Sequence, residues 1–547
     1  NNEVREKRTP NSAERRYQKT LSKNFTLYAD YKKNFNDRHD LSVMVGTSHE
    51  SENYDRFTAK RINFDQQENM SLQLGSAQDQ NAWSEGNQWT INSFFSRVNY
   101  TFANKYVIEG TIRADGSSRF DPDHRWGWFP GVNAAWRVGE EGFMKRLGWF
   151  EDLKVRASYG EMGNQSGIGL YDYIQLISLS NDYYPFGAGV KGQMATSGNI
   201  ISTSRTWETI QTTNVGFDFS TLNNRLYGSF DYFWKENKNM LIPKTYPSML
   251  GADAPSTNSG HLSIHGWEIS LGWRDQIKDF SYSVRFNISD AKNKVVDRVG
   301  SNLIKLGNNE TPTGYPLNSY FGYEFDGIIQ NEQELEAYKS RFSEGGIPGD
   351  LSVGDAMYKD LDGDGKLSVL GDGKEGSGDV KYLGDKNPRY NFGFNLSMAW
   401  KGFDLSAFIQ GVGRRTMFLE GESRCPMPEA WYQSAEYWYG KTWTSERTDA
   451  QYPAITLKDK RNYNYYVSTN TKFNVAYARL KNLQFGYTIP QTLTSKAGLQ
   501  KVRVYFSGED LFEVHNTPNG WDPEENSGSI TSYPFTRNYS FGINVVF

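Results

Sequence analysis

Hydrophobic and polar residues alternate along most of this chain, in segments that come in pairs. In the first pair, one face carries Phe25, Leu27, Ala29 and Tyr31, and the matching face of the next segment carries Leu41, Val43 and Val45. Alternation with a period of two is typical of a strand with one apolar face. The polar turn Asn36-Asp37-Arg38 lies between the two segments, so the pair predicts a β-hairpin.

Further pairs follow the same pattern. They are Ser93 to Phe102 with Tyr106 to Arg113, Asn214 to Phe219 with Leu226 to Phe233, Gly266 to Trp273 with Phe280 to Ile288, Tyr390 to Trp400 with Phe403 to Gln410, and Leu480 to Tyr487 with Val502 to Ser507. Long polar stretches separate some pairs, at Gly160 to Arg205, Gln330 to Asp385 and Thr416 to Asn470. Short turns at one end and long loops at the other are typical of outer-membrane β-barrels, whose long loops lie outside the cell. A chain of β-sandwich domains gives the same alternation, so periodicity alone leaves that alternative open.

The last nine residues favour the barrel. From Tyr539 to Phe547 the odd positions are Tyr, Phe, Ile, Val and Phe, and the even positions are Ser, Gly, Asn and Val. One face of such a strand suits lipid and the other suits a polar lumen. A terminal aromatic residue, here Phe547, resembles the assembly signal of outer-membrane barrels. The alternative is an ordinary amphipathic final strand.

The composition agrees with a chain of many strands. Among 547 residues there are 52 Gly, 34 Tyr and 33 Phe, and the net charge is −4. The chain has no run of about 18 apolar residues, so the sequence predicts no membrane-spanning helix. Alternation of apolar and polar residues accounts for the low mean hydropathy of −0.70. The absence of a basic field argues against nucleic acid as a partner. Asn1 to Arg5 does not form a signal peptide, so we expect the natural N-terminus to lie upstream.

Six groups of motifs occur in a fixed order along the chain. They are Ser96 to Tyr100 with Arg113 to Phe120, Trp126 to Pro130 with Ala135 to Arg137, Leu153 to Gly160 with Gly163 to Gln165, Trp207-Glu208 with Asn214 to Asp218, Arg479 to Leu483 with Gly486 to Pro490, and Gly520 to Glu524. Together they resemble the SusC/RagA family of TonB-dependent outer-membrane transporters. Trp126, Trp128 and Trp136 suit the aromatic girdles at the membrane surfaces. None of these motifs is catalytic in that family, and we assign no enzymatic activity.

The resemblance implies an all-β fold, a transmembrane antiparallel barrel of 22 strands that is closed by an N-terminal plug. It implies a multi-pass protein of the cell outer membrane that imports oligosaccharides or peptides, energised by TonB and working with a SusD-like lipoprotein. Residues 1–547 then correspond to the C-terminal portion, with about 16 strands. The plug, its TonB contact and the first strands are expected to be missing from this chain.

An open barrel leaves unpaired backbone groups in lipid, which costs several kcal/mol per group. We therefore expect either an N-terminal companion fragment that completes the barrel, or a smaller barrel closed by this chain alone. Two other functions remain alternatives, a plug-less porin-like passive channel and a surface glycan-binding protein without a membrane span.

An acidic loop resembles part of a calcium-binding loop. Asp360, Asp362 and Asp364 occupy alternate positions and are followed by Gly365, a spacing that can bring three carboxylates onto one hard cation. Lys366 offers its carbonyl oxygen. Gly371 stands where an EF-hand has its closing Glu, so Asp372 becomes the candidate closing ligand, with Glu375 and Asp379 as further candidates. The sequence predicts a Ca²⁺ site weaker than an EF-hand, and a solvated acidic turn is the alternative.

A second long polar stretch is rich in aromatic residues. The candidates for contact with a ligand or with the lipoprotein partner are Trp431, Tyr437, Trp438, Tyr439 and Trp443. Aromatic side chains stack on sugar rings and peptide side chains, but they also pack loops together. Both interpretations stay open at this point.

Overall fold

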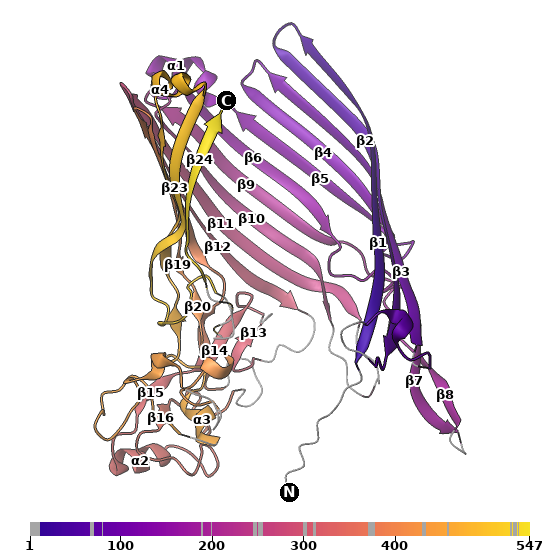
Figure 1. The fold of residues 1–547 in the computed structure, drawn as a ribbon, viewed down its shortest axis with the longest axis vertical. Coiled ribbons are helices and arrows are strands. Elements are labelled where there is room, and N and C mark those ends of the chain that lie inside the picture. The colour runs from indigo at the N-terminus through magenta and orange to yellow at the C-terminus, as the bar shows by residue number, and fades with distance from the viewer. Residues whose placement is uncertain are drawn as a thin grey trace.

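The computed structural model describes residues 11–65, 70–78, 80–186, 190–198, 200–243, 249, 255–298, 304–309, 313–369, 378–428, 434–456, 459–525, 528, 533 and 535–547. One antiparallel sheet of 15 strands dominates the structure, close to the 16 predicted (Figure 1). In spatial order its strands are β1 (Ser12–Phe35), β2 (His39–Ile62), β3 (Gln80–Phe102), β4 (Tyr106–Ser117), β5 (Trp126–Trp136), β6 (Asp152–Asn164), β9 (Glu208–Thr221), β10 (Leu226–Pro243), β11 (Ser256–Ile277), β12 (Phe280–Arg298), β18 (Arg389–Trp400), β19 (Phe403–Arg414), β22 (Tyr477–Thr488), β23 (Lys501–His515) and β24 (Asn538–Val546). Figure 1 shows that this sheet curves into a tall wall.

Smaller elements lie in the connections. The strands are β7 (Ile177–Phe186), β8 (Val190–Ser197), β13 (Gly307–Asn309), β14 (Ser319–Tyr323), β15 (Phe325–Ile328), β16 (Ala356–Tyr358), β17 (Val380–Asp385), β20 (Thr416–Met417) and β21 (Phe473–Asn474). The helices are α1 (Gly142–Leu147), α2 (Glu332–Lys339), α3 (Asp459–Asn464) and α4 (Gln491–Thr494), with 3-10 turns at Leu72–Leu74, Val138–Glu140, Gly421–Ser423, Glu436–Trp438 and Ser495–Ala497. None of the helices within the described ranges is long and apolar enough to cross a membrane.

The two ends of the wall differ in their connections. At one end, near the C-terminus, tight turns join the strands of five of the six predicted hairpins (top of Figure 1). The sixth pair, β22 and β23, is joined at the same end by a longer connection that contains α4. Asn36, Asn104, Asn223 and Lys401 have positive φ in these turns. Tight hairpin turns need this conformation, and Asn adopts it more readily than most residues. The long connections, including the stretch from Tyr320 to Asp385, lie at the opposite end.

The wall has one apolar and one polar face because side chains alternate along every strand. Phe25 and Leu27 of β1 are 62% and 61% exposed, and Phe541 and Ile543 of β24 are similarly open. Rings on this apolar face form a stack at the short-turn end, where Tyr106 lies 6.3 Å from Phe102 and 6.4 Å from Trp136 between centroids. The predicted lipid face therefore exists as a continuous surface.

Within the described residues, β1 pairs only with β2 and β24 pairs only with β23. The two end strands do not pair with each other, so these 15 strands do not form the smaller closed barrel that we considered. Each end strand keeps one row of backbone N–H and C=O groups available for pairing.

Three long connections pack together at the long-connection end, and we call their described residues within 304–388, 415–476 and 516–525 the loop body. It lies below β19 in Figure 1. Its hydrophobic clusters join residues from different connections, for example Tyr358 with Tyr463, and Tyr437 with Trp521. The loop body is thus a packed unit with its own core.

Candidate functional site

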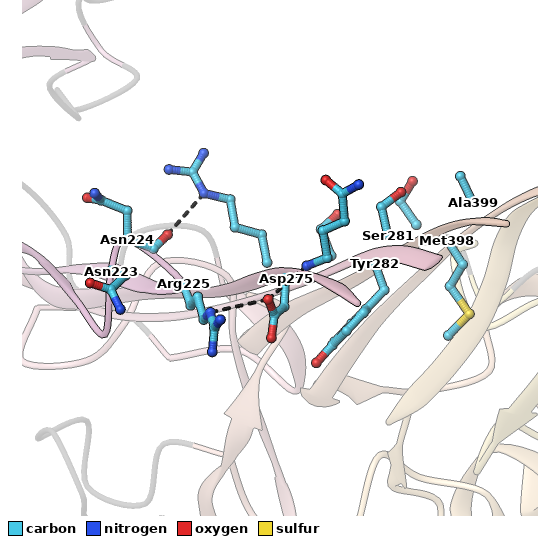
Figure 2. Close-up of a pocket in the computed structure, with 12 residues that line it drawn as sticks. Asn223, Asn224, Arg225, Asp275, Ser281, Tyr282, Met398 and Ala399 are labelled. Carbon is cyan, nitrogen blue, oxygen red and sulfur yellow. Dashed lines mark hydrogen bonds and ion pairs between the residues drawn. The ribbon is translucent and has the colours of Figure 1, made fainter. Parts of the chain in front are cut away.

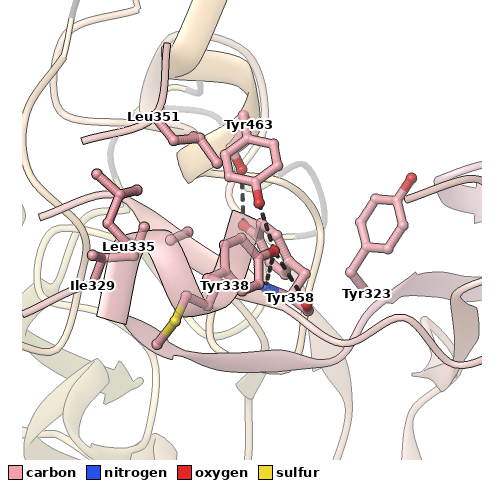
Figure 3. Packing of buried hydrophobic residues seen from close by; sticks show 9 residues of the cluster. Tyr323, Ile329, Leu335, Tyr338, Leu351, Tyr358 and Tyr463 are labelled. Atoms are coloured by element: carbon pink, nitrogen blue, oxygen red, sulfur yellow. Dashed lines mark hydrogen bonds between the residues drawn. The ribbon is translucent and has the colours of Figure 1, made fainter. Parts of the chain in front are cut away.

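A tyrosine network holds two connections of the loop body together (Figure 3). The hydroxyls of Tyr338 and Tyr463 lie 2.8 Å apart, and the Tyr338 hydroxyl also donates to the carbonyl of Tyr358 (3.1 Å). Tyr358 returns a hydrogen bond from its own hydroxyl to the Tyr463 carbonyl (2.9 Å). Burial raises the pKa of all three phenols, so they remain neutral donors and acceptors at physiological pH. Because every hydroxyl is paired, this core fixes how the two connections lie against each other.

The predicted aromatic contact residues separate into two groups. Tyr437 and Trp438 are buried at 7% and 3% exposure, and both pack against Tyr452 in the second cluster. Tyr439 is 90% exposed, whereas Trp443 is partly buried and donates from its indole nitrogen to Gln330 (3.1 Å). Trp431 lies outside the described residues. Packing therefore accounts for Tyr437 and Trp438, and Tyr439 is the side chain that is open to a ligand or partner.

Replacing Trp438 by alanine is expected to destabilise the loop body by about 3–5 kcal/mol, because a large buried ring leaves a cavity. Tyr439→Ala is the neighbouring control and should leave stability unchanged. Hydrogen exchange of the loop body in the whole protein measures both effects. Equal exchange in the two variants would contradict the buried role of Trp438.

The acidic loop brings together a slightly different set of carboxylates from the one that the spacing predicted. Carboxylate oxygens of Asp360, Asp362 and Asp379 all lie within 4.8 Å of one another, and Asp364 is outside this group. Asp360 accepts from the backbone nitrogens of Gly363 (2.6 Å) and Gly365 (2.9 Å), which closes the turn. Asp372 lies outside the described residues. Asp379, a further candidate from the sequence, comes from the far side of the loop.

The surroundings of Asp362 and Asp379 disfavour the ionised form of their carboxyl groups. Burial raises the pKa of Asp379, which is fully buried and accepts from the backbone nitrogens of Leu361 (2.6 Å) and Ser368 (2.7 Å). Burial also raises the pKa of Asp362, and the neighbouring charges of Asp364 and Asp360 raise it further. A divalent cation among these oxygens would relieve this repulsion. Lys366 is exposed, and its backbone nitrogen donates to Asp364 (2.7 Å).

Several of the sequence motifs meet at one corner of the wall, at the long-connection end of β4 to β9. Trp207 packs against Phe120 and Phe129 at 5.3 and 5.7 Å between ring centroids. A Cβ at Gly163 would lie 2.2 Å from the Phe129 ring, which explains the glycine in that motif. Ser117 donates to Gln165 (2.5 Å). The motifs therefore encode a packed joint between strands and connections.

A cavity of about 490 Å³ adjoins this joint on the polar face, and its lining includes Glu50, Arg113, Asp115 and Arg119. Arg113 donates to Asp115 at 2.7 Å, so these two charges balance each other. Arg119 donates to the carbonyl of Ile168 (3.1 Å), and its guanidinium lies 5.6 Å from the centre of the Trp89 ring. The motif from Arg113 to Phe120 contained Arg113, Asp115 and Arg119, whereas Glu50 belongs to no predicted motif. No spacing rule placed these residues around one cavity.

The polar face carries paired charges along the wall. Arg156 donates to Asp231 (2.5 Å) and to Asp218 (3.2 Å), and Lys154 lies 2.8 Å from Asp218. Arg503 and Asp404 form a similar pair between strands further along. Ion pairs of this kind suit a water-filled interior and do not suit lipid.

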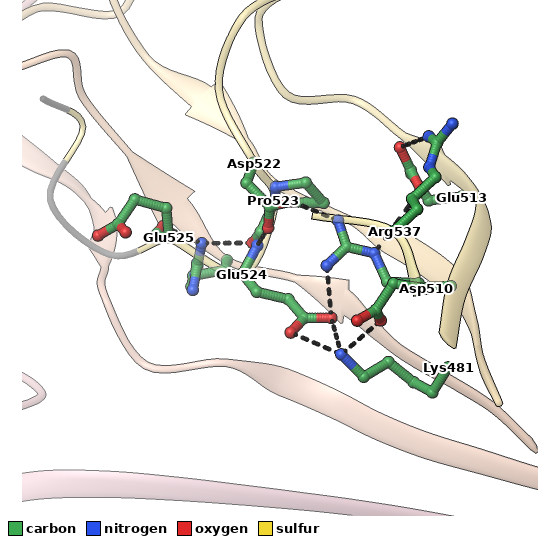
Figure 4. Close-up of polar contacts among 10 residues, drawn as sticks. Lys481, Asp510, Glu513, Asp522, Pro523, Glu524, Glu525 and Arg537 are labelled. Atoms are coloured by element: carbon green, nitrogen blue, oxygen red, sulfur yellow. Dashed lines mark hydrogen bonds and ion pairs between the residues drawn. The ribbon is translucent and has the colours of Figure 1, made fainter. Parts of the chain in front are cut away.

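A charged cluster anchors the connection between β23 and β24 (Figure 4). Arg479, only 1% exposed, lies 2.5 Å from Asp522 and 3.0 Å from Glu524. Its guanidinium also lies 4.4 Å from the ring centre of Phe535. Lys481 joins the cluster through Glu524 (3.1 Å) and Asp510 (2.8 Å). Two motifs that are far apart in the sequence are thus the two halves of one buried ion-pair network.

The short-turn end has a hollow of its own (Figure 2), with a volume of about 490 Å³. Arg225 pairs with Asp275 at 3.2 Å, and Arg274 donates to the carbonyl of Asn224 (3.0 Å). Both arginines are engaged, so the side chains of this hollow mainly stabilise the turns.

A wall with an apolar face, a polar charged face, short turns at one end and packed loops at the other defines a transmembrane β-barrel of the outer-membrane type. The family model described as TonB dependent receptor-like, beta-barrel, matches residues 2–511. The chain belongs to this family and is an outer-membrane protein. The family consists of receptors and transporters, and no enzyme function accompanies it.

Proteins with similar sequences and structures agree with this family assignment. The chain is 31% identical to TonB-dependent receptor P3 of Formosa agariphila over 96% of this chain and 52% of that protein. It is 26% identical to TonB-dependent receptor SusC of Bacteroides thetaiotaomicron over 96% of this chain and 50% of that protein. The structure of the RagAB peptide transporter matches 98% of this chain and 56% of that chain, with a TM-score of 0.80 and 23% identity, which shows the shared fold. The chain thus spans about half the length of the curated relatives that it matches.

Proposed function

We propose that this chain is the C-terminal barrel portion, residues 1–547, of an active outer-membrane importer of oligosaccharides or peptides. The observation that carries the proposal is the polar face of the wall with its ion pairs, which does not suit lipid but suits a solute path. In this account the apolar face contacts membrane lipid, and the loop body surrounds the outer mouth and meets the ligand. A SusD-like surface lipoprotein covers that mouth, and TonB supplies energy through a plug that lies outside the described residues.

Among the described residues, β1 and β24 each have one unpaired edge, and these edges also need a partner segment. In hydrocarbon each unpaired backbone group costs several kcal/mol, so β1 and β24 must be joined by further strands. We assign this closure to an N-terminal companion segment, either of the same polypeptide or of a separate fragment. Co-purification of such a segment with the chain from outer membranes tests the assignment, and a stable membrane form of the chain without any companion contradicts it.

A passive channel is the rival function, and conductance separates it from active import. We expect the whole protein in a planar lipid bilayer with KCl to show no steady open conductance, because a plug obstructs the lumen. A plug-less channel would conduct continuously. Removal of the plug should produce that conductance, which serves as the control for correct insertion.

We further propose that the acidic loop binds one Ca²⁺ through Asp360, Asp362 and Asp379. The support is the convergence of three carboxylates and the raised pKa of Asp362 and Asp379. Calorimetry of the whole protein with CaCl₂ should detect binding at millimolar concentration or below. Asp362→Asn should abolish it, whereas Asp364→Asn, outside the group, should retain it. No heat of binding at millimolar calcium would contradict the site.

The pH dependence of this site follows from the raised pKa values. Without metal, the loop favours protonated Asp362 and Asp379, so its stability falls as pH rises through their raised pKa values. Calcium requires the ionised carboxylates, and its stabilising effect should therefore be small near pH 4, the ordinary pKa of Asp, and grow at higher pH. Thermal unfolding with calcium or with a chelator measures this difference. A calcium effect that is independent of pH would contradict the assigned ligands.

A further inference from the structure

The apolar face of β1 changes its character along the strand. Between Phe25 and Tyr31 this face is apolar, whereas toward the long-connection end it alternates basic and apolar residues. In order, the residues on this part of the face are Arg15, Tyr17, Lys19, Leu21 and Lys23. The β1–β2 register runs without a shift from Phe35 opposite His39 to Ser12 opposite Ile62, so the face is the same throughout. The three cations therefore point to the outside of the wall.

These cations are exposed and lack protein partners among the described residues. Arg15, Lys19 and Lys23 are exposed and form no ion pair with the described residues. Cations on the polar face of the same strand are paired, since Arg16 lies 2.7 Å from Glu14 and Lys32 lies 2.9 Å from Asp30. The acid nearest in register is Asp55 of β2, opposite Lys19, and the two form no ion pair.

The spacing relates these cations to the membrane surface. Lys23 and Lys33 bracket the apolar part of the face, and about ten tilted residues span about 25 Å, the height of the lipid-facing band of a barrel. Lys23 thus lies at the outer surface. By the same geometry Lys19 and Arg15 lie about 10 and 20 Å further from the membrane.

This height distinguishes between classes of anionic lipid. A phospholipid offers its phosphate only at the membrane surface, where Lys23 lies. A lipid that carries a phosphorylated oligosaccharide places further anionic groups above that surface, at the level of Lys19 and Arg15. Tyr17 and Leu21, 60% and 42% exposed, offer apolar contacts between the cations. Guanidinium and ammonium groups at this spacing suit phosphate groups at several heights.

We propose that the outward column of Arg15, Lys19 and Lys23 on β1 binds the phosphate groups of lipopolysaccharide in the outer leaflet. The inference rests on the membrane placement of the wall and does not depend on import. It gives the exposed outer half of β1 a lipid partner in addition to the strand that pairs with its edge.

The test uses the whole protein, purified in detergent, and measures its affinity for purified lipopolysaccharide. Each lost cation near a charged surface should weaken binding about fivefold, and the triple variant Arg15→Gln, Lys19→Gln, Lys23→Gln on the order of a hundredfold. Lys33→Gln, on the same face at the other leaflet, should have no effect. Phosphatase-treated lipopolysaccharide should bind the unaltered protein as weakly as the triple variant binds the phosphorylated form.

Three results would overturn the proposal. They are unchanged affinity of the triple variant, equal binding of phosphorylated and phosphatase-treated lipopolysaccharide, and displacement of lipopolysaccharide by low-millimolar inorganic phosphate, which would indicate an adventitious ion only. Heat-modifiable mobility in electrophoresis confirms that each variant is folded. Because the substitutions are on the surface of the strand, we expect this mobility to be unchanged.

Discussion

Replacing Arg479 by methionine should destabilise the outer part of the wall by about 3–5 kcal/mol. Arg479 is almost fully buried, and its loss leaves Asp522 and Glu524 as neighbouring acids without their central cation. The connection between β23 and β24 should then detach from the wall. Limited proteolysis and thermal unfolding of the whole protein measure the change.

Arg537→Gln is a matched control for this prediction. Arg537 contacts Glu513, which also lies beside Arg479, but its side chain is 50% exposed and its ion pair spans 2.6 Å at the surface. Exposed pairs contribute at most about 1 kcal/mol. If Arg479→Met is no more destabilising than Arg537→Gln, the buried network does not anchor the connection.

Deletion of Phe547 should remove most of the protein from the outer membrane. The residue directly follows β24 and is 82% exposed, so packing among the described residues does not require it. We propose that Phe547 is the aromatic assembly signal predicted from the sequence, and that the residue is recognised during barrel assembly. Quantitative immunoblotting of outer-membrane fractions measures the loss.

The controls for Phe547 separate assembly from stability. Phe547→Tyr keeps a terminal aromatic ring and should restore normal amounts, whereas Phe541→Leu keeps an apolar side chain inside β24 and should have little effect. Normal amounts of the deletion variant would contradict an assembly role for Phe547.

The sequence predicted the membrane-level part of the strands well because lipid on one side and water on the other impose a period of two. β24 and the hairpin of β18 and β19 illustrate this. The outer half of β1 was missed because residues 12–24 lie above the lipid, where polar residues are tolerated on both faces. Backbone pairing with β2 keeps residues 12–24 in the strand, and a hydrophobic pattern cannot reveal this pairing.

The candidate site was predicted only in part, since its contacts join distant residues. Tyr338 meets Tyr463, and Arg479 meets Asp522, although no local spacing relates the members of either pair. In the acidic loop, local spacing identified Asp360 and Asp362, but the third carboxylate is Asp379 because the loop folds back on itself. Tyr437 and Trp438 were recognisable as aromatic, but their burial depends on Tyr452 and Trp521 from other segments.

The most direct test of the central claim is uptake by cells that carry the whole protein, with and without a functional TonB system. Cells receive a mixed pool of peptides and a mixed pool of oligosaccharides, and mass spectrometry follows depletion of each from the medium. The account predicts depletion of one pool that requires both this protein and TonB. Equal depletion in cells without TonB would contradict active import and favour a passive channel.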